Sequence, residues 1–200
     1  MGWAAKLCMG GVGVLALCVP AWAADQVPAQ IDAARAAYQK NDLPRTARAL
    51  EAALQDIHDR LGKALADTMP PASAGWQADP PEIQGLGQVG GGLVVTRAYG
   101  KGESSLNASL FLDSPAVEAA GALFSNPAAT AAQPNMKRIK LGAEDALLRF
   151  DASNKAGEVT MVLGGRILLS IEGDNIASAD VLTDAAKGWN VAKIRSLGGL

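Results

Sequence analysis

Five carboxylates in the second half of the chain are the side chains best suited to catalysis. They are Asp145, Asp151, Glu158, Glu172 and Asp174. Hydrolysis by a carboxylate pair needs two such groups about 5 to 9 Å apart in a cleft, and spacing along the chain does not show that any two meet. Strand ends and hairpin loops also carry acids for solubility. We therefore predict a non-catalytic protein, with a carboxylate-dependent hydrolase as the weaker alternative.

Histidine, cysteine and glycine patterns predict neither a metal site nor a cofactor. His58 is the only histidine, and both cysteines lie in the N-terminal apolar segment, so the usual tetrahedral zinc ligand sets cannot be assembled. A Ser-His-Asp triad would depend on His58, and no serine stands in a G-x-S-x-G context. Residues 85–90 spell G-x-G-x-x-G, but a proline pair precedes them where a dinucleotide site needs an apolar strand.

Arg97, Tyr99 and Trp76 form the candidate binding groove. Arg97 and Tyr99 alternate on a predicted strand, on the same face as Leu93 and Val95. Either this face becomes polar as the strand leaves the core, or the two side chains line a partly open groove that would suit an anionic or peptide ligand. Trp76 stands in a Pro/Gly-rich segment, where it would either plug the edge of the core or line the same groove.

The first 23 residues predict export. Lys6 precedes an apolar run of about 13 residues, Leu7 to Val19, and Ala21-Trp22-Ala23 has the small-x-small pattern of a signal-peptidase site. A spanning helix needs about 20 apolar residues, so we expect cleavage after Ala23, no stable membrane span after leader removal, and a periplasmic protein. Both cysteines would leave with the leader, which leaves a thiol-free chain.

Composition excludes some partners. The 200 residues carry a formal charge of −2 and only 4% aromatic residues, with no run of like charges. A basic patch and stacking aromatics are what nucleic-acid binding requires. We therefore expect no nucleic-acid partner.

Residues 24–69 predict a helical hairpin. One helix is expected from Pro28 to Lys40. A second follows from Leu43 to the stop at Pro70, with an apolar residue every three or four positions. The candidate interaction stripe on it consists of Leu50, Leu54, Ile57 and Leu61. Two alternatives stay open, because the stripe could pack on the protein's own sheet or on another chain.

Residues 70–92 predict a Pro/Gly-rich linker, and residues 93–200 an antiparallel α+β domain. Alternating apolar residues between Leu93 and Leu112 predict a β-hairpin at the centre of a sheet of about six strands, with helices on one face. Residues 128–134 are expected to form a loop.

Two resemblances follow from these patterns. Residues 33–54 resemble a single tetratricopeptide-type helical hairpin. The stretch from Gly75 to Leu197 resembles the small exported bacterial α+β domains of the PsbP-like kind, through Gly75-Trp76, residues 141–146, the Gly164-Gly165-Arg166 turn and the closing helix. The second resemblance implies a fold and a compartment, and it assigns no functional residue.

Together these features predict an exported accessory or envelope-associated protein that acts through protein interaction. The alternative is a carrier that holds a small ligand or a lipid between the sheet and the long helix. An enclosed apolar cavity would favour the carrier, an exposed apolar stripe on the second helix would favour the interaction protein, and two acids converging in a cleft would favour the hydrolase.

Overall fold

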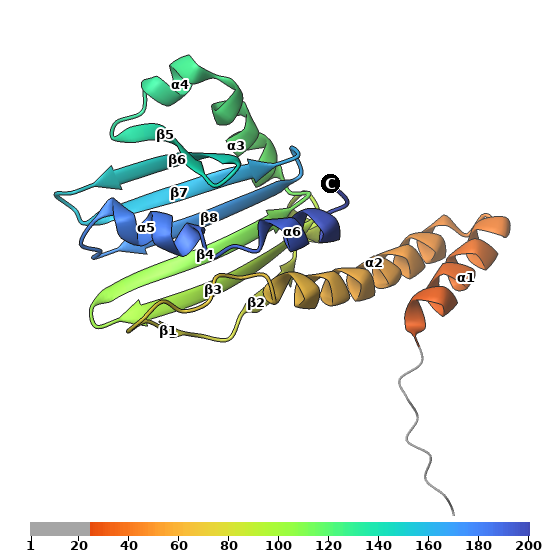
Figure 1. Ribbon diagram of the computed structural model, residues 1–200. Coiled ribbons are helices and arrows are strands. Elements are labelled where there is room, and N and C mark those ends of the chain that lie inside the picture. The colour runs from red at the N-terminus through yellow and green to blue at the C-terminus, as the bar shows by residue number, and fades with distance from the viewer. Residues whose placement is uncertain (1–24) are drawn as a thin grey trace, which may run out of the picture.

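The computed structural model describes residues 25–200, so the predicted leader and its cleavage site after Ala23 lie outside the described residues. A helical hairpin projects from a body built on one antiparallel sheet (Figure 1). The predicted α+β class and the N-terminal hairpin are confirmed. The sheet has eight strands where about six were expected.

The hairpin consists of α1 (Gln26–Gln39) and α2 (Leu43–Ala66). Asp42 accepts a hydrogen bond from the backbone N–H of Arg45 at 3.1 Å, which caps the start of α2, and Pro44 suits its first turn. Ala34 and Ala37 of α1 and Ala53 of α2 are buried where the helices meet. Small side chains there let the two backbones approach closely.

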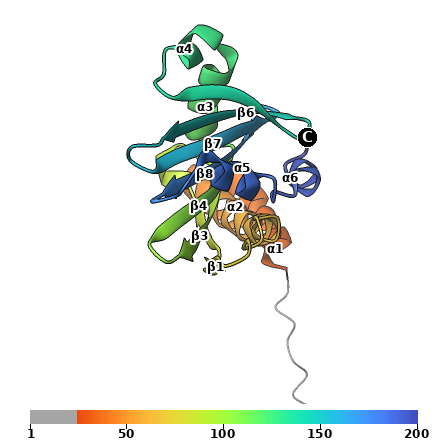
Figure 2. The same ribbon diagram turned by 60° about the vertical axis from the view of Figure 1, so that its left-hand side comes forward.

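The sheet is two meanders joined side by side. Its strand order is β1-β3-β4-β8-β7-β6-β5, and β2 pairs with β3 beside β1 (Figure 2). The strands are β1 (Gln77–Ala78), β2 (Glu82–Gly85), β3 (Leu93–Lys101), β4 (Ser104–Leu112), β5 (Met136–Leu141), β6 (Glu144–Asp151), β7 (Ala156–Leu163) and β8 (Ile167–Asp174). The predicted β3–β4 hairpin is present, but β8 occupies the centre, because the last strand inserts beside β4.

The segment predicted as a linker contributes to the sheet. β1 and β2 both lie within residues 70–92 and pair with β3, with Gln77 opposite Gly100 and Glu82 opposite Thr96. A short 3-10 turn, Gly87–Val89, follows β2. Two short strands at a sheet edge carry too few alternating residues to be recognised among prolines and glycines.

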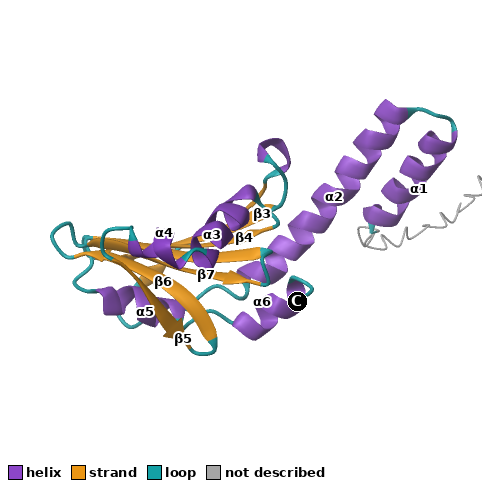
Figure 3. Ribbon diagram, turned by 90° about the horizontal axis from the view of Figure 1, so that it is seen from above, coloured by secondary structure: helices purple, strands orange, loops and turns teal. Residues whose placement is uncertain are grey.

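Helices cover both faces of the sheet, whereas one covered face was expected. α5 (Ala179–Ala186), α6 (Val191–Leu197) and the end of α2 lie on one face, and α3 (Pro115–Ser125) lies on the other (Figure 3). The chain must travel from β4 to the far edge at β5, and α3 and α4 (Pro127–Ala131) carry it across the second face. α4 also replaces part of the expected loop at residues 128–134.

The core lies between the sheet and the helices α5 and α6. Because side chains alternate between the two faces of a strand, every second side chain of each strand points toward these helices. The largest side chains with less than 2% exposure are Leu65, Leu93, Leu110, Leu163, Ile167, Leu169, Ile171, Ile176, Leu182, Ile194, Val95 and Val159. Along the described part of the chain, no helix combines the length and apolar character needed to cross a membrane.

Candidate functional site

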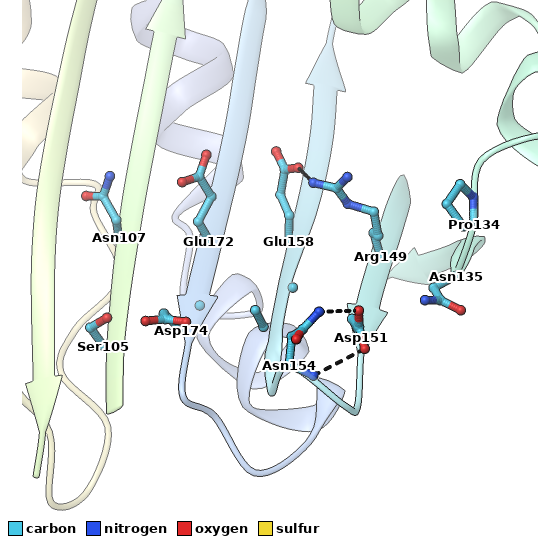
Figure 4. A pocket seen from close by; sticks show the side chains of 13 residues that line it. Ser105, Asn107, Pro134, Asn135, Arg149, Asp151, Asn154, Glu158, Glu172 and Asp174 are labelled. Atoms are coloured by element: carbon cyan, nitrogen blue, oxygen red, sulfur yellow. Dashed lines mark hydrogen bonds and ion pairs between the residues drawn. The ribbon is translucent and has the colours of Figure 1, made fainter. Parts of the chain in front are cut away.

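A polar trough of about 600 Å³ lies on the second face of the sheet, beside the part that α3 covers. Register places one residue from each of four neighbouring strands in a row across it: Asn107, Glu172, Glu158 and Arg149 (Figure 4). Asp151, Asn154 and Asp174 line its lower end. Four of the five carboxylates singled out in the sequence therefore meet, while Asp145 pairs with Lys140.

The two glutamates of the trough differ in their partners. Glu158 accepts a hydrogen bond from the Ser170 hydroxyl at 3.0 Å and lies 3.5 Å from the Arg149 guanidinium. Glu172 is exposed and has neither a hydrogen bond nor an ion pair within residues 25–200. Directly opposite residues of an antiparallel pair have Cβ atoms about 4.5 to 5.5 Å apart, so the two carboxylates are close enough to repel each other.

Asp151 has a structural part in the β6–β7 turn. Its carboxylate accepts hydrogen bonds from the Ser153 hydroxyl and from the backbone N–H groups of Ser153 and Asn154. The Ser153 hydroxyl, followed by these backbone N–H groups, lowers the pKa of Asp151. The carboxylate oxygens of Asp151 are thus engaged in holding the turn. Among residues 25–200, no three of the side chains His, Cys, Asp and Glu come together as a metal site would require.

Tyr99 and Trp76 of the candidate groove meet on the face of the sheet that α5 and α6 cover. Tyr99 is 6% exposed, and its hydroxyl donates to the Pro70 carbonyl oxygen at 2.6 Å. Burial raises the pKa of the Tyr99 phenol. Trp76 packs against the core beside it, and the hollow between them has a volume of about 10 Å³. That volume holds about one water molecule, so this end of the groove has no room for a lipid.

Arg97 faces the sheet edge. Its Nε donates to the Asp79 carbonyl oxygen at 2.8 Å, and its guanidinium carbon lies 5.7 Å from the centre of the Tyr99 ring. It lines a separate hollow of about 260 Å³ with Pro80, Glu82 and neighbouring residues. The sequence thus named three residues that are neighbours in space, but they surround no single ligand-sized groove.

The hairpin carries most of the exposed apolar side chains. Eight large apolar residues of the described chain are exposed, and six of them belong to α1 and α2. We call these six the hairpin face: Ile31, Tyr38, Leu43, Leu50, Leu54 and Ile57. Leu50 and Leu54 are 51% and 50% exposed, whereas Leu61, the last residue of the predicted stripe, is half-buried and packs against the core.

Both helices contribute to the same side of the hairpin. The buried alanines mark the sides that α1 and α2 turn toward each other. At 3.6 residues per turn, each residue of the hairpin face is rotated about its own helix axis by roughly 60 to 120° from the direction that points to the partner helix. The rotation has the same sense in both helices. Because the helices run antiparallel, it brings all six side chains to the same side of the hairpin. Helical spacing in the sequence places Ile31 and Tyr38 on one face of α1, but the candidate interaction stripe did not include them.

The base of the hairpin is held by an ion pair with a testable pH dependence. Asp25 caps α1 and accepts two hydrogen bonds from Arg60 of α2, at 2.6 and 2.9 Å. The Arg60 guanidinium, with the Val27 backbone N–H, lowers the pKa of the Asp25 carboxyl. A carboxyl with a depressed folded pKa stabilises the folded state above its unfolded value of about 3.9 and loses this effect as the pH falls through the folded value.

We therefore expect the start of α1 to lose order in acid before the body unfolds. Amide hydrogen exchange of α1 between pH 6 and pH 2.5, corrected for the intrinsic pH dependence of exchange, measures this loss of order. In Asp25→Asn the corrected exchange rate should already be raised at pH 6. An α1 whose corrected exchange is equally slow at both pH values in the wild type would contradict this part of the account.

Comparison with protein-family models, with curated proteins and with solved structures found no match to the chain. The tetratricopeptide-type and PsbP-like resemblances therefore stay predictions.

Proposed function

We propose that the chain is an exported, non-catalytic protein that acts in the envelope through protein interaction, with the hairpin face as its contact surface. One observation carries the proposal: six half-exposed apolar residues lie on one side of a hairpin that projects from the body. A contiguous exposed apolar surface of this kind marks interaction sites in soluble proteins. Neither α1 nor the first half of α2 needs these side chains for its own packing, which uses alanines.

A photo-crosslinking residue at position 54, in cells that export the protein, tests this proposal. The matched control carries the same residue at position 89, because Val89 is also exposed, at 67%, but lies on the body. We expect a defined protein adduct from position 54 and none from position 89. Absence of an adduct from both positions, or equal adducts from both, would overturn the proposal.

Export itself has a direct test. We expect the intact mass of the purified protein to correspond to a chain that begins at Ala24, because the leader pattern ends at Ala23. A chain that begins at Met1 would contradict the compartment, and with it the envelope setting of the proposal.

The carboxylate-dependent hydrolase is the second candidate, favoured by Glu158 and Glu172 facing one trough. Retaining glycosidases use a pair of carboxyl groups that face one cleft, and the register places these two glutamates directly opposite each other. The open sheet face argues against it, because it excludes no water and encloses no substrate. Under the leading proposal 4-nitrophenyl glycosides are not hydrolysed. Hydrolysis by the wild type would establish the hydrolase instead, if Glu172→Gln abolishes it and Glu82→Gln, the same change at an exposed glutamate outside the trough, retains it.

A further inference from the structure

The length of the hairpin face limits what can cover it. From Leu43 to Ile57 the face runs about 21 Å along α2, at 1.5 Å per residue. Beyond it, Leu61 is half-buried and Leu65 is completely buried in the body. A helix that packs along the face must therefore end near Leu61. If a second hairpin of this length packs antiparallel to the first, its tip lies near Leu61.

The charges along the hairpin favour the same antiparallel arrangement. The half nearer the tip, residues 35–50, contains four basic residues and one acidic residue. The half nearer the body, residues 25–34 and 51–61, contains five acidic residues and one basic residue. Two parallel copies would place like charges together. Two antiparallel copies place the basic half of each alongside the acidic half of the other, which avoids that repulsion.

The available area is sufficient for a two-fold contact. Six large side chains, each about half exposed, offer on the order of 600 Å² per copy, or about 1,200 Å² in total, at the lower end of specific interfaces. In a two-fold dimer, the same patch on each copy contacts the other copy. None of the six residues of the hairpin face is charged, so burial of these side chains leaves no charge unpaired.

We propose that a second copy of this chain covers the hairpin face. The two-fold axis crosses α2 between Leu50 and Leu54, so that Leu50 of one copy meets Leu54 of the other and the two hairpins form an antiparallel four-helix bundle. This inference rests on the proposed function, because it names the partner of the same face. The two bodies then lie at opposite ends of the bundle.

Light scattering after size-exclusion chromatography, over a concentration series of the exported protein, tests the inference. We expect a dimer, a dissociation constant raised at least 100-fold in Leu54→Asp, and no change in Val89→Asp. A wild type that stays monomeric up to 100 μM would overturn the inference. So would a dimer that Leu54→Asp leaves intact.

Charge exchange tests the antiparallel alignment without touching the apolar face. Arg35→Glu should weaken the dimer several-fold, and so should Asp32→Arg. The contacts between α1 and α2 place these two residues on either side of the same two-fold axis, so Arg35 of one copy meets Asp32 of the other. A mixture of the two variants should recover wild-type association as a heterodimer. A mixture no tighter than either variant alone would overturn the antiparallel arrangement.

The failures of the two proposals are distinguishable. An adduct from position 54 to a different protein would overturn the second copy and leave the interaction function standing. A Leu54→Asp variant whose melting temperature falls strongly, measured where both proteins are monomeric, would place the face in the protein's own core and overturn both.

Discussion

Leu110→Ala is expected to lower the free energy of unfolding by about 2 to 5 kcal/mol, the range for buried leucines that leave a cavity. Leu110 is 0% exposed in β4, between Val95 of β3 and Leu169 of β8, which are also completely buried. The same change in the hairpin face, Leu54→Ala, is expected to alter the free energy of unfolding by less than about 0.5 kcal/mol. Urea unfolding of dilute protein measures both values.

This pair of identical substitutions separates core from contact surface. The chemistry removed is the same, so the difference reports only what surrounds each leucine. Equal losses of several kcal/mol in both variants would mean that Leu54 packs inside its own fold. Equal small losses would mean that β4 is not in the core.

Gly92→Ala is the second large effect, expected to cost on the order of 3 kcal/mol. Gly92 has φ +87°, and a Cβ there would collide with the carbonyl oxygen of Leu112, which is backbone and cannot turn away. An alanine in the left-handed region costs about 1 to 2 kcal/mol, and overpacking about 1 to 3 kcal/mol more.

Gly91→Ala is the matched control for that variant. Gly91 has φ +95°, but a Cβ there meets no atom within 4 Å. It should therefore cost only the conformational part, about 1 to 2 kcal/mol, in the same urea experiment. Equal costs at the two positions would contradict the close approach of residue 92 to the end of β4.

The helical hairpin was the most predictable part of the chain. Its stripe repeats over more than twenty residues, its two helices begin near capping residues, and a proline pair stops the second helix. The sequence did not show which part of the stripe is covered. Leu54 and Leu65 share one periodicity, but only the second reaches the sheet, and burial depends on where the body lies.

The sheet was predictable strand by strand and not in its order. The sequence predicts each of the strands β3 to β8, yet pairing between β4 and β8 joins residues more than fifty positions apart. No local pattern encodes such a pairing. The meeting of Glu158 with Glu172 has a different cause, the length of the β7–β8 turn. A two-residue Gly164-Gly165 turn would place Glu158 opposite Ile171, whereas the observed three-residue loop places it opposite Glu172.

Native mass spectrometry of the protein purified after export tests whether the chain acts through protein contact or carries a small ligand, because it reports bound molecules and subunit number together. We expect a protein assembly, with two copies of the chain, that retains no small molecule. A monomer that carries a lipid or a metabolite would contradict it, and would favour a carrier instead.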